Sequence, residues 1–140
     1  MRLYIFKTFV FILLLSGKLF ANTQLFNEGV NLFKIKKFNQ AKIKFEQDIV
    51  MNPKSEMSYL YLSKIFNKLD NKNLEEQNLN TVILLNPSNE EAIYNLAKLK
   101  LNVSDFKKSR ELNDKLKRLC NQFCDKSNRL NIEIENLSKK

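Results

Sequence analysis

The apolar residues between Leu25 and Met51 recur at intervals of three or four, which is the spacing of one face of an α-helix. Two such runs are present, and they comprise Leu25, Gly29, Leu32 and Phe33, then Ala41, Phe45, Ile49 and Met51. The polar pair Lys36-Lys37 separates the two runs. This pattern predicts two helices joined by a turn at that pair, with Pro53 closing the unit.

The same arrangement returns twice further along the chain, at a constant interval that we call the repeat period. The only two prolines, Pro53 and Pro87, each follow an asparagine, and their numbers differ by this period (87 − 53 = 34). The core positions of the second and third units are apolar or small, and they comprise Tyr59, Leu62, Ser63, Phe66, Leu79, Val82, Ile83, Leu85, Ile93, Leu96, Ala97, Phe106, Ser109 and Leu116. A period of about 34 residues is that of a helix-turn-helix repeat that stacks into a solenoid. We predict repeats at about residues 22–54, 55–88 and 89–121.

Small and polar residues predict further features of these helices. Gly29 costs about 1 kcal/mol of helix propensity relative to alanine, so we expect it where two helices pack closely. The segment Ser88-x-x-Glu91 matches a capping box, which predicts the start of the third unit. Asp105 or Ser104 is expected to cap the second helix of that unit.

A last apolar stripe follows the third unit, with steps of 4, 3, 4 and 3 along the chain. Its members are Phe123, Ser127, Leu130, Ile134 and Leu137. The residues between them are mostly polar, so one face of a helix over about 123–138 is apolar. Because a solenoid needs such a helix to cover its last open face, we predict a cap. A helix that binds a partner is the alternative interpretation.

The repeated pattern resembles the tetratricopeptide repeat (TPR) family. The matching motifs are Gly29-x2-Leu32, Ala41-x3-Phe45 and Pro53 in the first unit, and Tyr59-x2-Leu62-Ser63-x2-Phe66 and Pro87 in the second. The resemblance covers Thr23 to about Asn121 and departs from the family pattern at Lys72, Glu75, Lys100 and Asn113. It implies an all-α fold, an α-solenoid of about three helix-turn-helix repeats with a C-terminal capping helix.

The resemblance also implies a binding surface, because TPR arrays bind extended peptides or helices in a concave groove lined by the first helix of each unit. The groove positions carried over are Phe26, Val30 and Phe33 in the first unit, Met57, Leu60 and Lys64 in the second, and Tyr94, Lys98 and Leu101 in the third. Such a groove suits an apolar peptide or helix with an acidic group. Packing against the neighbouring unit is the alternative role of each residue. Phe26 and Val30 occupy two places of the family's carboxylate clamp, so that activity is not implied.

Residues 1–21 are typical of a secretory signal peptide. Arg2 and Lys7 give a basic start, Thr8 to Leu15 form a short apolar core, and Ala21 is the last residue before the expected cut. A retained membrane anchor is the alternative, but a spanning helix needs about 20 apolar residues and Lys7 and Lys18 leave too few. We expect residues 22–140 to be periplasmic, with no membrane span after cleavage.

Composition agrees with a helical class and limits the partners. The 140 residues include only 2 glycines and 2 prolines, so helix breakers are rare. The formal net charge is +9, and the leader contributes three of these charges, which leaves +6 for residues 22–140. The lysines are spread along the chain without a basic stripe interleaved with aromatic residues, so no nucleic-acid partner is expected.

Cys120 and Cys124 are the only cysteines, and they lie where the third unit meets the predicted cap. Two nearby thiols of an exported protein are expected to pair. We interpret the pair as a disulfide that staples the cap to the last repeat, and a redox role is the alternative. The Cys-x3-Cys spacing differs from the Cys-x2-Cys of dithiol oxidoreductases, which argues against catalysis.

No catalytic or metal-binding constellation is evident in the sequence. Histidine is absent, and the two glycines form no phosphate-binding loop. Two cysteines without histidine cannot supply the four ligands of a zinc site, so no metal or other cofactor is expected. The acidic pairs Glu75-Glu76 and Glu90-Glu91 lie near predicted helix starts, where the helix dipole favours them, and this explanation is taken as sufficient.

Two functions of different classes agree with these observations. The first is a non-enzymatic adaptor of the bacterial cell envelope that binds an envelope protein or peptide in its groove. The second is a basic module that holds envelope glycan or anionic lipid head groups through its lysines, with binding that salt would screen. No residue pattern supports an enzyme, and none indicates an oligomeric state.

Overall fold

The structure is a computed structural model that describes residues 24–139. The chain divides into two compact units, Met1–Ser58 and Tyr59–Lys140, which we describe separately. All regular structure in residues 24–139 is helical, which confirms the all-α prediction. The predicted signal peptide lies outside the described residues.

Unit 1 contains a helix over residues 24–34, α2 (Phe38–Met51), and the first turn of α3 (Glu56–Lys68). The side chain of Phe45 is fully buried and lies over Gly29. A Cβ atom at position 29 would lie 2.8 Å from Cε1 of Phe45, too close for any side chain. The prediction that Gly29 permits close helix packing is therefore confirmed.

Unit 1 also contains a buried carboxylate that the sequence pattern did not indicate. Asp48 of α2 is only 2% exposed. The hydroxyls of Ser55 and Ser58 donate hydrogen bonds to its Oδ2, at 2.6 and 2.5 Å. These bonds tie the end of α2 to the start of α3, because they satisfy a charge that is costly to bury alone.

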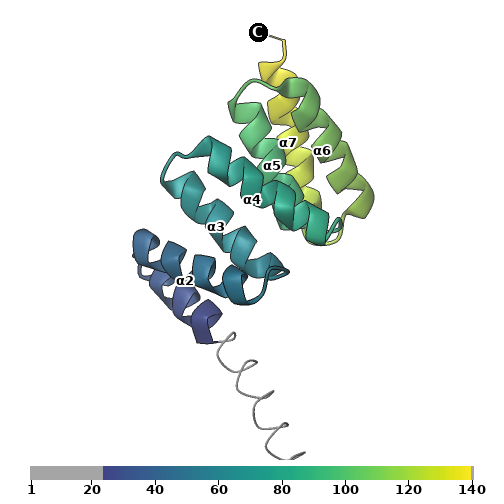
Figure 1. Ribbon diagram of the computed structural model, residues 1–140. Helices are drawn as coiled ribbons and strands as arrows, with labels where there is room; N and C mark the ends of the chain where they lie inside the picture. Colours follow the sequence, from purple (N-terminus) through teal and green to yellow (C-terminus); the bar gives the residue numbers. More distant parts are fainter. Residues whose placement is uncertain (1–23, 140) are drawn as a thin grey trace, which may run out of the picture. The chain divides into compact units, whose positions relative to one another are not determined.

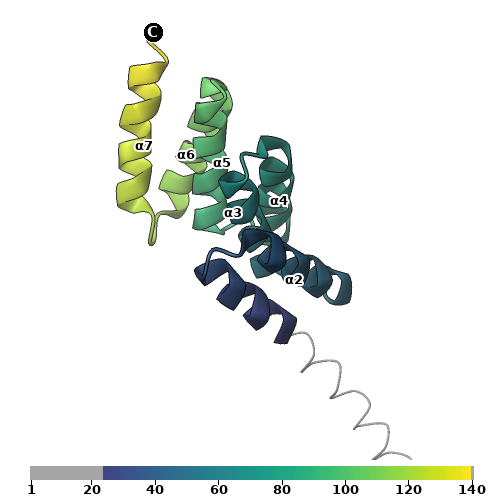
Figure 2. The same cartoon turned by 90° about the vertical axis from the view of Figure 1, so that its left-hand side faces the viewer.

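Unit 2 contains the rest of α3 and the helices α4 (Lys72–Leu85), α5 (Glu90–Asn102), α6 (Phe106–Leu119) and α7 (Cys124–Leu137) (Figure 1). Each helix from α4 to α6 packs against the next, and α7 also contacts α5. The core is formed mainly by aliphatic side chains, namely Leu60, Leu79, Val82, Ala92, Ile93, Leu96, Ala97, Leu99, Leu101, Leu112, Leu116, Leu130 and Ile134. Figure 2 shows α7 at the edge of this unit, as expected for a cap.

The helices recur with the repeat period that the sequence predicts. The second helices of the three repeats begin at Phe38, Lys72 and Phe106. The first helices of the second and third repeats begin at Glu56 and Glu90, and α7 begins one period later, at Cys124. The left-handed turn residues Lys36, Asp70 and Ser104 recur at the same interval, with φ values of 61°, 52° and 61°. Each ends a first helix through the paired backbone hydrogen bonds of a Schellman motif. The turns are therefore equivalent even though none contains glycine.

Helix capping follows the predictions in part. Asp105 caps α6, where its carboxylate accepts a hydrogen bond from the Lys108 amide at 3.0 Å. The predicted capping box at Ser88 is wrong, because the cap of α5 is Asn89, whose side chain accepts from the Ala92 amide at 2.8 Å. The Ser88 hydroxyl instead donates to Oδ1 of Asn86 at 2.8 Å.

Three departures from the family pattern lie where polar pairs link neighbouring helices. Glu75 is buried and accepts hydrogen bonds from the Asn67 side chain at 3.1 and 3.2 Å. Lys100 forms an ion pair with Glu76 at 2.6 Å. Asn113 is paired with Ser127. The helix dipole is thus not a sufficient explanation of Glu75 and Glu76, because both carboxylates also have side-chain partners.

Candidate functional site

Four of the predicted groove residues lie in compact unit 1: three from the first repeat, and Met57 from the start of the second repeat. They are only partly accessible. Phe26, Val30 and Phe33 are half-buried on the helix over residues 24–34, while Met57 is 44% exposed. The Phe26 ring lies 5.8 Å from the Phe45 ring, between centroids, and the Phe33 ring lies 5.5 Å from that of Phe38. Two of these rings therefore also pack against α2 of their own repeat.

The groove residues predicted in unit 2 fall into two groups. Leu60 and Leu101 are 2% and 4% exposed and belong to the hydrophobic core. Lys64 on α3, and Tyr94 and Lys98 on α5, are half-buried and keep accessible surface. We call the surface of α3, α5 and α7 that carries Lys64, Tyr94 and Lys98 the first-helix face of unit 2.

An ion pair links α3 and α5 on this face. Nζ of Lys64 lies 2.8 Å from Oε1 of Glu91 and 5.0 Å from the centroid of the Tyr61 ring. Its charge is thus already matched by a carboxylate and an aromatic face. Lys98 has no ion pair or hydrogen bond among residues 24–139, so it is the lysine of this face that is available to an acidic ligand.

An aromatic cluster lies where α5 meets the start of α7. The rings of Tyr94 and Phe123 are 5.6 Å apart between centroids. Nζ of Lys126 lies 4.0 Å from the centroid of Phe123 and 5.5 Å from that of Tyr94. The cluster combines apolar ring surface with a positive charge held by cation–π attraction.

Glu90, in the first turn of α5, fixes the turn that carries Phe123. Its carboxylate accepts hydrogen bonds from the backbone amides of Asn121, Gln122 and Phe123 at 2.7, 2.8 and 2.8 Å. Desolvation acts to raise the pKa of Glu90, but the three amide hydrogen bonds outweigh it and lower the pKa below its usual value. The helix dipole alone was therefore an insufficient explanation for Glu90 as well.

The sequence reasoning missed Tyr61, Glu91, Phe123 and Lys126, which contact Lys64 or Tyr94, and the exposed Ile132 at the equivalent repeat position on α7. The repeat period could have found two of them, because Glu91 lies one period after Met57 and Ile132 lies one period after Lys98. Ile132 is on α7 and is 59% exposed. Because α7 was predicted to be a cap, no groove position was predicted on it.

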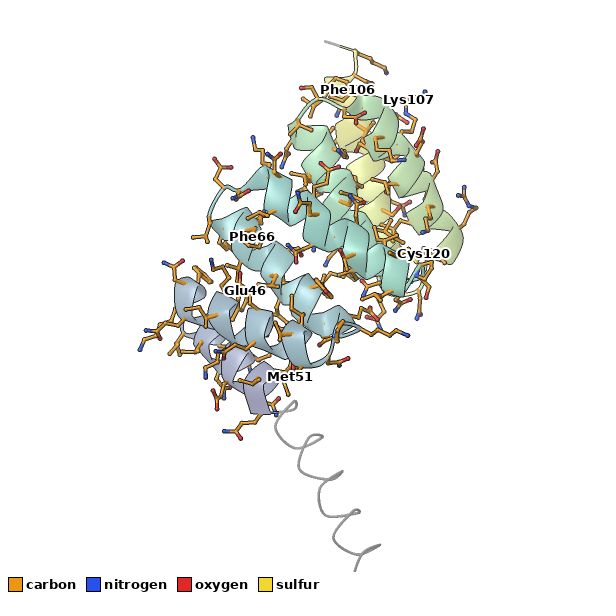
Figure 3. The ribbon with its side chains drawn as sticks, in the orientation of Figure 1. Glu46, Met51, Phe66, Phe106, Lys107 and Cys120 are labelled. Carbon is orange, nitrogen blue, oxygen red and sulfur yellow. A yellow bond between two sulfur atoms is a disulfide. The ribbon has the colours of Figure 1, made fainter. Side chains whose placement is uncertain are left out.

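The two cysteines lie at the junction of α6 and α7, at the end of α6 far from Lys107 (Figure 3). Their sulfur atoms are 2.03 Å apart and their Cα atoms 5.0 Å apart, as in a disulfide. Cys120 follows α6 as Asn52 follows α2 and Asn86 follows α4. The two earlier junctions continue with proline, so the cysteine pair lies where the third junction lacks one.

Residues 24–139 contain no group of three or more acidic, cysteine or histidine side chains that could hold a metal ion. Within the same range, no helix has the length and apolar character that crossing a membrane requires.

Comparison with solved structures establishes the fold. The chain is similar to the first TPR domain of Spaghetti (RPAP3) bound to an HSP90 peptide, with a TM-score of 0.75, 15% identity, and coverage of 84% of this chain and 93% of that one. It is similar to the type III secretion chaperone SycD of Yersinia enterocolitica in complex with a peptide of the translocator YopD, with a TM-score of 0.75, 15% identity, and coverage of 84% and 94%. The TPR2B domain of yeast Sti1 gives a TM-score of 0.77, 15% identity, and coverage of 83% and 97%.

Comparisons of sequence give no match: no protein-family profile and no curated protein matches this chain. The solved structures nevertheless show that the chain has the fold of tetratricopeptide repeat domains, which confirms the predicted solenoid with its capping helix.

Proposed function

We propose that this protein is a non-enzymatic adaptor of the bacterial cell envelope that binds a peptide or helix of a partner protein on the first-helix face of unit 2. The observation that carries this proposal is the combination of Lys98, Tyr94 and Ile132 on α5 and α7. One is a lysine without a partner in the described residues, one is an aromatic ring, and one is an aliphatic side chain that is 59% exposed.

Proteins with the same fold support a peptide as the ligand. The similar structures of Spaghetti and SycD each hold a peptide of another protein, and that of Sti1 is a complex with pHsp70. For the chain described here, the ligand that suits the face has an acidic group for Lys98 and an apolar side chain for Tyr94 and Ile132. The signal-like leader supports an envelope partner and a periplasmic location.

The experiment is crosslinking in intact cells, followed by identification of the proteins that co-purify with the chain. Tyr94→Ala and Lys98→Glu are the test variants, because both side chains are half-buried and neither belongs to the fully buried core. Tyr94 also packs against the core, so folding of its variant is checked separately. Leu84→Ser on α4 is the control, since Leu84 is 80% exposed and lies on a second helix. Leu60→Glu is unsuitable, because it would place a charge in the core.

One dominant partner that is lost with Tyr94→Ala and Lys98→Glu, and kept with Leu84→Ser, is the expected result. A partner that both test variants retain would show that this face is not the binding site. Circular dichroism of each variant establishes that the helical fold is unchanged.

A further inference from the structure

An exposed apolar side chain occurs at the same turn position of each repeat in unit 2. Leu69 and Val103 directly follow α3 and α5 and are 45% and 44% exposed, and Leu137 ends α7 and is 44% exposed. Each of these residues lies one repeat period after the one before it. Figure 1 shows the α3–α4 turn, the α5–α6 turn and the C-terminal end of α7 on the same side of the unit. We call this side, formed by residues 68–72, 102–108 and 136–139, the turn edge.

Packing does not account for these apolar residues. The Schellman motif is often accompanied by an apolar contact of the residue after the left-handed position. Here that residue is Asn71 or Asp105, and both are polar and cap the next helix. Leu69 and Val103 precede the left-handed residue and keep almost half of their surface exposed, so the core needs neither of them.

The turn edge also carries the net positive charge of the unit. The described part of the unit, residues 59–139, contains 14 Lys and Arg and 11 Asp and Glu, a net charge of +3. The turn edge, residues 68–72, 102–108 and 136–139, contains five lysines and two aspartates, which is also +3. The remainder of the unit is therefore neutral, and the excess charge is confined to the side that exposes the apolar residues.

Helix dipoles explain only part of this charge. Lys68 ends α3, where a cation is favoured. Lys72 and Lys107 lie in the first turns of α4 and α6, where the dipole disfavours a cation. In Figure 3 Lys107 and Cys120 lie at opposite ends of α6. The opposite edge, near the cysteines, carries Glu90, Glu91 and Asp125 together with Lys117, Arg118 and Lys126, so these charges cancel.

Unit 1 repeats the same composition at its own turn. Ile35 is 62% exposed and lies one repeat period before Leu69. Lys34, Lys36 and Lys37 flank it, and all three are exposed. Each turn of this type thus joins an aliphatic side chain to nearby lysines. In unit 2 the α3–α4 turn is also hollowed, with a depression of about 420 Å³ lined by Leu69, Asp70, Asn71, Lys72 and Asn73.

We propose that the turn edge of unit 2 binds an anionic lipid surface. Leu69, Val103 and Leu137 enter the boundary between head groups and acyl chains, while the neighbouring lysines meet lipid phosphates. A membrane interface rewards both features, because apolar burial and attraction to anionic lipid add to each other. An anionic glycan would use the lysines but would leave the exposed aliphatic side chains without a role.

The test measures flotation with vesicles of phosphatidylcholine and phosphatidylglycerol at a 7:3 ratio, and with vesicles of phosphatidylcholine alone. The chain used begins at Asn22 and so includes every described residue, 24–139. It omits the leader because the apolar core at Thr8 to Leu15 would itself bind lipid. The expected result is binding to the anionic vesicles and little binding to the neutral ones.

The charge variant is Lys68→Gln/Lys72→Gln/Lys107→Gln. Each lysine near an anionic membrane strengthens binding about fivefold, so we expect a loss of about 100-fold. Its control, Lys115→Gln/Arg118→Gln/Arg129→Gln, loses the same total charge outside the turn edge. The apolar variant is Leu69→Ser/Val103→Ser, with an expected loss of about tenfold or more. Its control is Leu84→Ser/Leu119→Ser, at positions that are 80% and 38% exposed.

Specific loss in both edge variants, with both controls close to the unmodified chain, supports the proposal. Equal losses of binding in the charge variant and its control would overturn the proposal, because binding would then depend on the total charge and not on the turn edge. Full binding of the apolar variant would overturn the lipid assignment and favour an anionic glycan, as would binding to soluble polyanionic glycan in place of vesicles. Absence of binding by the unmodified chain to anionic vesicles would also overturn it.

Discussion

Two junctions of unit 2 place different chemistry at the same repeat positions. Between α4 and α5 these positions are held by Leu79 and Ile93, and one repeat period later, between α6 and α7, by Asn113 and Ser127. All four side chains are fully buried. The first two belong to the hydrophobic core. Asn113 and Ser127 instead exchange hydrogen bonds, from Nδ2 to the Ser127 carbonyl at 3.1 Å and from the Ser127 hydroxyl to Oδ1 at 2.8 Å.

The difference teaches how a repeat and a cap are held by different forces. Apolar burial is non-directional and gives the larger free energy. A buried hydrogen bond adds only about 0.5–1.5 kcal/mol net, but it requires defined geometry. The hydrogen bonds at the α6–α7 junction therefore fix the position of α7 but contribute less free energy than apolar side chains would. Glu90 and the cysteine pair add further constraints there.

The largest expected effect comes from breaking the apolar junction. Ile93→Ala removes a fully buried aliphatic side chain and should lower the free energy of unfolding by about 2–5 kcal/mol. Urea unfolding followed by circular dichroism measures this change. Leu84→Ala is the matched control, because Leu84 is 80% exposed and should change the stability little. A similar loss in both variants would contradict a core role for Ile93.

The polar junction should lose less when one partner is removed. Asn113→Ala leaves the buried Ser127 hydroxyl without its acceptor, and we expect a loss of about 1–3 kcal/mol by the same unfolding measurement. In Asn113→Leu/Ser127→Ala both polar groups are replaced, so most of the loss should be recovered. If the double variant is as unstable as the single one, the lost stability comes from the change in side-chain volume. An unsatisfied hydrogen bond would then not be its cause.

Opening the cysteine pair should loosen the cap by a comparable amount. Cys120→Ser/Cys124→Ser removes a small closed loop, whose entropy corresponds to about 2 kcal/mol of stability. Hydrogen exchange of the α7 amides locates the effect, which should be confined to α7 and the α6–α7 turn. The reduced unmodified chain serves as the control and should match the variant. Unchanged exchange in α7 would argue against a staple.

The smallest effect should appear only in acid. Because the folded chain lowers the pKa of Glu90, its stabilisation is present above the unfolded value and is lost as the pH falls through the lowered folded value. We therefore expect the protection of the α7 amides to fall below about pH 4.5, near the unperturbed value of a glutamate. Glu90→Gln should remove this part of the pH dependence. A variant that follows the same pH profile as the unmodified chain would assign the change to another group.

Glu75 provides a contrast of opposite sign within the same acid titration. Burial raises the pKa of Glu75, and this effect outweighs the hydrogen bonds from Asn67, which lower it. A raised carboxyl pKa makes the folded chain less stable as the pH rises through the interval above the unfolded value. Glu75→Gln should therefore gain stability relative to the unmodified chain towards neutral pH, which distinguishes it from Glu90→Gln.

The fold was predictable because the proline spacing and the apolar periodicity both indicate the same repeat. Pro53, Pro87 and the small residue Gly29 carry information that each neighbouring repeat reinforces. The left-handed turns at Lys36, Asp70 and Ser104 were not predictable, because no glycine identifies them. Position in the repeat, more than residue type, imposes that conformation. The choice of Asn89 over Ser88 as the cap of α5 is a shift of one residue, which periodicity does not resolve.

The candidate site was less predictable than the fold. Leu60 and Leu101 were placed in the groove by resemblance, but both are core residues in this chain. Tyr94 and Lys98 lie on α5 seven and three positions before Leu101, yet they remain accessible, so positions of one helical stripe differ in burial. The contact of Tyr94 with Phe123 joins residues 29 positions apart (123 − 94 = 29), and the turn that carries Phe123 is held by Glu90 of α5, so local patterns do not indicate it.

The hydrogen bonds of Glu90 also impose an order on folding. They join residues separated by 31 to 33 positions, whereas the Cys120–Cys124 link closes only a few. The amides at 121–123 find their common acceptor only after the first turn of α5 has formed, and closing the longer loop carries the greater entropic cost. We therefore expect the last helix to dock onto a preformed third repeat, so that the α7 contacts form late in refolding.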